Sequence, residues 1–75
     1  MSAGRPAVPA GPVEDAPAGF IPRAEQQRIL EDALAGIGLG GHDRRVVEWM
    51  AGWDASTVLT VASWIVRARA EGPAR

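Results

Sequence analysis

The sequence predicts an all-α protein, a small domain of three helices behind a disordered N-terminal tail. Two observations support the helices. Apolar residues recur at helical spacing in three segments, and capping residues stand at the ends of these segments. A third observation supports the tail. Four prolines fall within the first nineteen residues, with alanine and glycine between them, and these residues lack the apolar content to fold.

The predicted division of the chain is a tail at 1–19, one helical domain at 20–72 and a short C-terminal end at 73–75. A core of about fifty residues is marginal by itself, because a short chain buries a small fraction of its surface. The chain contains no cysteine, so no disulfide reinforces it. Oligomerisation or docking on another protein is therefore the expected reinforcement.

The first helix is predicted over Arg23 to Leu34, with Pro22 suited to its first position. Its apolar stripe faces the core, and acidic and amide side chains fall on the other side. Glycines at 36, 38, 40 and 41 end the helix and predict a flexible connector. This connector is expected to carry Ile37 and Leu39 into the core.

The second helix is predicted over Arg44 to Ala51, with Asp43 as its N-cap. Its apolar residues share one face. A turn of about three residues, centred on Trp53, separates it from the third helix, so the second and third helices are expected to be close neighbours.

The third helix is predicted to begin at Asp54, whose side chain can cap the backbone N–H of Ser56 or Thr57, and to end at Gly72. Its apolar residues cover an arc of roughly 220°. A helix so widely apolar is expected to lie centrally, packed from several sides. One polar strip remains, made of Ser56, Thr60, Ser63 and Arg67.

The surplus of apolar surface predicts a non-enzymatic interaction module, either a homo-oligomer or a small subunit or regulator that docks on a larger protein. Tryptophan is enriched among residues that dominate binding energy, and a small core has limited room for three indoles. The alternative is that all three tryptophans are core residues. The predicted protein interface consists of Trp53, Val58, Val61, Trp64, Ile65 and Ala68.

The pair of helices at residues 43–71 resembles a helix-turn-helix, which places its second helix in the major groove of DNA. This resemblance implies an alternative function as a DNA-binding regulator. The formal charge of −1 and the absence of lysine oppose it, since phosphate neutralisation provides most DNA affinity. The residues that would contact nucleic acid are Arg44, Arg45, Ser56, Thr60, Ser63 and Arg67.

Catalytic, metal and cofactor motifs are not found in the sequence, and no small-molecule substrate is indicated. His42 is the single histidine and has no second histidine or cysteine to share a metal. No serine lies in a nucleophile-elbow motif. The chain is therefore not expected to be an enzyme or to carry a cofactor.

The N-terminal residues have no apolar run typical of a signal peptide, and the longest uncharged apolar run, 55–66, is too short to span a bilayer. A cytoplasmic location is therefore expected. All eight basic residues are arginine, and alanine, glycine and proline are abundant. In this composition the chain resembles short uncharacterised helical proteins of high-GC actinobacteria and their phages. The resemblance implies no particular activity.

Overall fold

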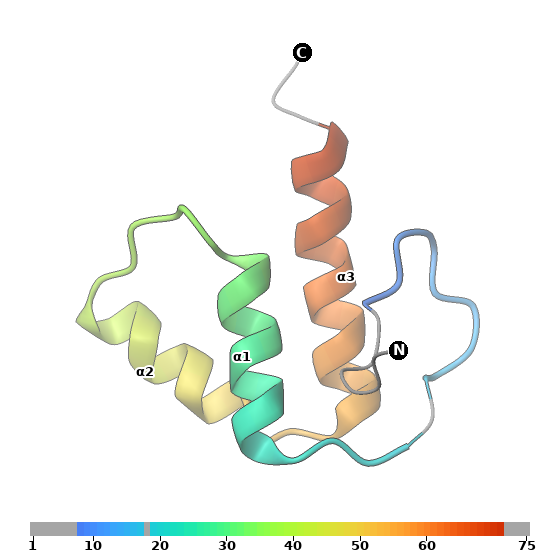
Figure 1. The fold of residues 1–75 in the computed structure, drawn as a ribbon, viewed down its shortest axis with the longest axis horizontal. Helices are drawn as coiled ribbons and strands as arrows, with labels where there is room; N and C mark the ends of the chain where they lie inside the picture. The colour runs from blue at the N-terminus through green and yellow to red at the C-terminus, as the bar shows by residue number, and fades with distance from the viewer. Residues whose placement is uncertain (1–7, 18, 72–75) are drawn as a thin grey trace, which may run out of the picture.

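A computed structural model describes residues 8–17 and 19–71 of the chain. Three helices are present, α1 (Arg23–Ala33), α2 (Gly41–Met50) and α3 (Ala55–Glu71), and the described residues form no strand (Figure 1). The prediction of an all-α domain with three helices is confirmed. Residues 8–17 also lack regular secondary structure.

Helix α1 lies between the other two helices and packs against both of them (Figure 1). Helices α2 and α3 diverge from the short turn at 51–54 and share few close contacts beyond it. The prediction that the third helix is central is therefore wrong. So is the prediction that the second and third helices are close neighbours, since they are joined by the turn but pack little against each other. Two neighbouring side chains of α1 make this arrangement. Ile29 packs in the cluster shared with α3, and Leu30 packs in the cluster that also contains Val47 of α2.

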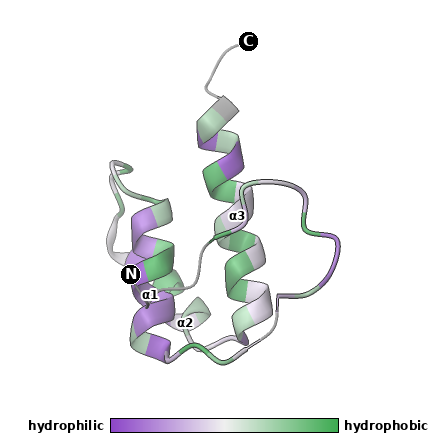
Figure 2. Cartoon of the chain, turned by 45° about the vertical axis from the view of Figure 1, so that its right-hand side comes forward, coloured by the Kyte–Doolittle hydropathy of each residue, from purple (hydrophilic) through white to green (hydrophobic). Residues whose placement is uncertain are grey.

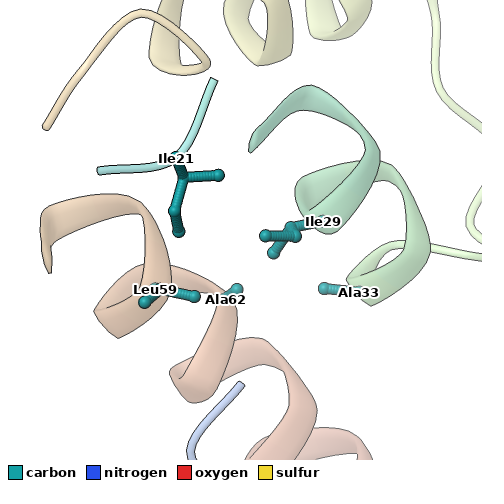
Figure 3. Close-up of a cluster of buried hydrophobic side chains, with 5 residues drawn as sticks. All are labelled: Ile21, Ile29, Ala33, Leu59 and Ala62. Carbon is teal, nitrogen blue, oxygen red and sulfur yellow. The ribbon is translucent and has the colours of Figure 1, made fainter. Parts of the chain in front are cut away.

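The first core cluster joins α1 to α3 and includes Ile21, two residues before α1. Ala33 and Ala62 belong to it, and such small side chains let two helix backbones approach closely. Figure 3 shows its side chains converging in the space between the two helices. The members of this cluster are Ile21, Ile29, Ala33, Leu59 and Ala62.

The second core cluster joins all three helices near the turn at 51–54. Its buried members are Leu30, Val47, Ala51 and Val58. Leu39 packs against this cluster, as predicted for the glycine-rich connector. Ile37 does not follow the prediction, because its side chain is exposed in the connector. Gly36 before it has a φ of 87°, a backbone conformation that L side chains rarely adopt.

The helix starts follow their capping chemistry. Helix α3 begins as predicted, since the Asp54 carboxylate accepts the Thr57 backbone N–H at 3.0 Å. Helix α2 begins three residues earlier than predicted. Asp43 lies in its first turn rather than at the N-cap, and its Oδ2 accepts the Gly40 backbone N–H at 2.9 Å. The predicted stop at Gly72 lies outside the described residues.

Two arginines bond the carbonyl ends of helices other than their own. The Arg23 guanidinium donates to the carbonyl oxygen of Glu48 in the last turn of α2, at 2.6 Å. The Arg69 guanidinium donates to the carbonyl oxygen of Ala33, the last residue of α1, at 2.8 Å. Neither α1 nor α2 carries a basic residue in its own last turn. A cation near these carbonyls is favourable. Arg23 of α1 supplies it at the end of α2, and Arg69 of α3 supplies it at the end of α1.

Candidate interaction surface

Helix α3 keeps an apolar face that the other described residues cover only in part. We call this face the α3 seam, and it consists of Val61, Trp64, Ile65 and Ala68. Trp64 is 58% exposed, Ala68 is exposed, and the other two side chains are partly buried. The spacing of three, four and seven residues keeps the four side chains on one side of the helix. In the view of Figure 2, hydrophobic colour runs along much of α3, whereas α1 presents a distinct hydrophilic side.

The α3 seam borders an open apolar groove of about 310 Å³. Helices α2 and α3 supply its two walls, and α1 with the connector supplies Leu30, Leu34 and Leu39. Val61 and Ile65 belong both to the α3 seam and to the groove. The groove arises because α2 and α3 diverge from their shared turn. The remaining lining residues are Asp43, Val46, Val47 and Met50.

Two residues of the predicted interface, Val58 and Trp53, pack within the domain instead. Val58 is completely buried in the second core cluster, so its assignment to an interface is wrong and it acts as a core residue. Trp53 is half-buried against that cluster and makes an edge-to-face contact with Trp49, with ring centroids 4.8 Å apart. Trp49 is itself 62% exposed. The three tryptophans are therefore divided between core packing and surface.

The polar strip of α3 is largely engaged within the chain. Ser63 is 0% exposed, and its hydroxyl donates to the carbonyl oxygen of Pro9 at 2.8 Å. Arg67 Nε donates to the same hydroxyl oxygen at 3.1 Å. Val8 adds an apolar contact to the first core cluster. The N-terminal segment thus lies on α3 and covers the middle of the strip that a helix-turn-helix would present to DNA.

The first turn of α3 uses its polar side chains locally. The Ser56 hydroxyl donates to Asp54 Oδ2 at 2.8 Å, and the Thr60 hydroxyl donates to the Ser56 carbonyl oxygen at 2.8 Å. The bonds from the Ser56 hydroxyl and from the Thr57 backbone and hydroxyl lower the pKa of the Asp54 carboxyl. Such bonds favour its charged form, which suits the positive end of a helix.

The arginines proposed for DNA contact have different surroundings. Arg44 and Arg45 are exposed in α2, whereas Arg67 is half-buried on Ser63. Only the α2 pair extends freely toward solvent, and that pair is not on the helix that would read the groove.

Residues 8–17 and 19–71 contain no group of three histidine, cysteine or acidic side chains that could hold a metal ion. His42 is exposed at the second position of α2. None of the helices in this part of the chain combines the length and hydropathy needed to cross a bilayer.

No protein-family model, no curated protein and no solved structure matches this chain.

Proposed function

We propose that this chain is a non-enzymatic interaction module of the cytoplasm that binds a helix on the α3 seam and the adjoining groove. The observation that carries the proposal is the second apolar face of α3. Val58, Leu59 and Ala62 already bury one face of this helix in the core. A helix that packs only within its own domain has a polar solvent-exposed face, but in α3 the exposed side carries Trp64.

The energetics support binding at Trp64. An indole buries about 150–250 Å² when it is fully covered. Since 58% of the Trp64 surface is exposed, covering it contributes about 2–4 kcal/mol at about 25 cal/mol per Å². The flanking side chains Val61, Ile65 and Ala68 extend the apolar contact along the helix. This arrangement matches the groove and anchor pattern of helix recognition.

In-cell photocrosslinking tests the proposal. A photoreactive amino acid replaces Ala68 on the α3 seam, and a matched variant carries it at Ala24, an exposed alanine of α1. We expect protein adducts from position 68 but not from position 24. Adding Trp64→Ala is expected to remove them. The proposal fails if position 68 gives no adduct, or if both positions react equally.

DNA binding is the alternative, and the engaged polar strip gives it little support. Ser63 is covered by Pro9, and Arg67 is held against Ser63. A gel shift with duplex DNA at low and moderate salt separates the two functions. Steeply salt-dependent binding that is lost when Arg44, Arg45 and Arg67 are changed to alanine would favour the regulator. We expect no such binding.

A further inference from the structure

The α3 seam is complementary to itself in an antiparallel arrangement. Its centre falls between Trp64 and Ile65, and Val61 and Ala68 stand at its two ends. When a second α3 runs in the opposite direction about this centre, Val61 lies opposite Ala68 of the second copy. Trp64 then lies opposite Ile65 of the second copy. Each larger side chain meets a smaller one, which suits close helix packing.

From this relationship we propose that the occupant of the α3 seam is α3 of a second copy of the chain, in an antiparallel, two-fold symmetric dimer. The proposal rests on the function proposed above and names its partner. A two-fold interface uses the same patch on both copies, so one surface must supply both the projecting and the receiving group. Here the exposed Trp64 projects beside the groove to which Val61 and Ile65 belong.

The charges of α3 favour the antiparallel direction. Residues 55–66 carry no charge, whereas Arg67 and Arg69 lie near the C-terminal end, and Asp54 caps the N-terminal end. Parallel copies in register would set the basic ends of the two helices at the same level. In the antiparallel register, the two Arg69 backbones lie about 13 Å apart along the axis at 1.5 Å per residue. Each basic end also points toward the end of the other helix that carries Asp54, and the helix dipoles oppose one another.

The size of the surface predicts a weak dimer. The α3 seam spans one heptad, a rise of about 10 Å. A standard interface buries about 800 Å² on each partner, which one heptad does not supply. The groove walls Val46 and Met50 add apolar area beside it. We therefore expect a monomer–dimer equilibrium that is micromolar or weaker and depends on concentration.

Cysteine crosslinking tests both partner and direction, because the natural chain has no cysteine. Two full-length variants are made, Val61→Cys and Ala68→Cys. In the antiparallel register, position 61 of one copy faces position 68 of the other. Equivalent positions lie about 10 Å apart along the axis. A disulfide needs Cα atoms about 4.4–6.8 Å apart. A mixture of the variants is expected to form covalent dimers about tenfold faster than either variant alone.

Matched variants show whether the crosslink depends on contact between the two α3 seams. Adding Trp64→Ala to both cysteine variants is expected to slow the mixed crosslink about tenfold. Adding Trp49→Ala is expected to leave its rate unchanged, since Trp49 is as exposed as Trp64 but lies on α2. Light scattering of the natural chain over a range of concentrations is expected to detect a mass that rises toward twice that of the monomer.

Each other outcome identifies what fails. Crosslinking of each variant with itself, as fast as in the mixture, overturns the antiparallel arrangement. A constant monomer mass overturns self-association. If position 68 still photocrosslinks to a different protein, the interaction module stands with another occupant. If neither a dimer nor an adduct forms, the proposed function fails as well.

Discussion

The side-chain amide of Gln26 lies in the interior and donates a hydrogen bond to the carbonyl oxygen of Ala51 at 2.8 Å. The same amide nitrogen donates to the carbonyl oxygen of Trp53, also at 2.8 Å. One side chain of α1 thereby satisfies two carbonyls of the turn that joins α2 to α3. This fixes the point from which those two helices diverge.

Changing Gln26 to leucine should lower the free energy of unfolding by about 1–3 kcal/mol, because two carbonyls lose their donor. Urea denaturation followed by tryptophan fluorescence measures the change. Gln27→Leu is the matched control, since the Gln27 amide bonds Glu31 at the exposed surface and its loss should cost under about 0.5 kcal/mol. Equal losses in the two variants would mean that the Gln26 bonds add nothing.

The division of α3 between core and seam can be measured with two valines. Val58→Ala should lower the free energy of unfolding by about 1–3 kcal/mol, because it leaves a cavity in the second core cluster. Val61→Ala should cost less than half as much in dilute solution, where its outer side meets water. Thermal unfolding at low concentration measures both. A larger cost at Val61 would reverse the assignment of the two faces.

The Asp54 cap predicts a pH dependence with a defined sign. Hydrogen bonds lower the pKa of Asp54 in the folded chain below its unfolded value. Its contribution to stability is therefore fully present above the unfolded pKa, near 4, and is lost as the pH falls through the folded pKa. Asp54→Asn keeps a capping oxygen but cannot titrate. The stability difference between the natural chain and Asp54→Asn should shrink as the pH falls below about 4. A constant difference would contradict this origin.

Arg69→Ala should lower the free energy of unfolding by about 1 kcal/mol, because the last carbonyl of α1 loses its charged donor. Urea denaturation of this variant is compared with that of Arg45→Ala, an exposed arginine of α2. The control should change stability by less than about 0.5 kcal/mol. Equal changes in the free energy of unfolding of the two variants would mean that the Arg69 hydrogen bond does not stabilise the fold.

The N-terminal segment should detach from α3 when Val8 is changed to aspartate, because a charge would be buried against the first core cluster. Limited proteolysis is expected to cut residues 8–17 several-fold faster in Val8→Asp than in the natural chain. Ala10→Asp provides the control, since Ala10 is exposed and its change should leave the cutting rate near the natural value. Fast cutting in all three chains would mean that the contact does not protect the segment.

The helices could be predicted from sequence because their signals are local. Asp54 and its partner Thr57 are three residues apart, and the start of α3 follows from them. The start of α2 does not follow from the sequence in the same way, because Asp43 can serve either as an N-cap or as the third helical residue. Only the connector geometry, with Gly40 within reach of the carboxylate, distinguishes the two.

The arrangement of the helices depends on contacts that no local pattern contains. Ile29 and Leu30 look equivalent in an apolar stripe, yet Ile29 packs in the cluster that joins α1 to α3, and Leu30 packs in the cluster that joins all three helices. The burial of Gln26 depends on carbonyls 25 and 27 positions away, and the covering of Ser63 depends on a carbonyl 54 positions away. All four residues of the α3 seam belong to the predicted interface, which also includes Trp53 and Val58. Val58 is a core residue instead, because helical periodicity alone does not tell which of two apolar faces the domain uses.

The bond between Ser63 and Pro9 also has a consequence for synthesis of the chain. The ribosome makes Pro9 before it makes Ser63, and the two residues are 54 positions apart. At about 5–20 residues per second, the N-terminal segment waits about 3–10 seconds for its site on α3. Its prolines disfavour both helix and strand during that wait. The N-terminal segment is therefore made before the site that it occupies, and it can reach that site only after α3 has been made.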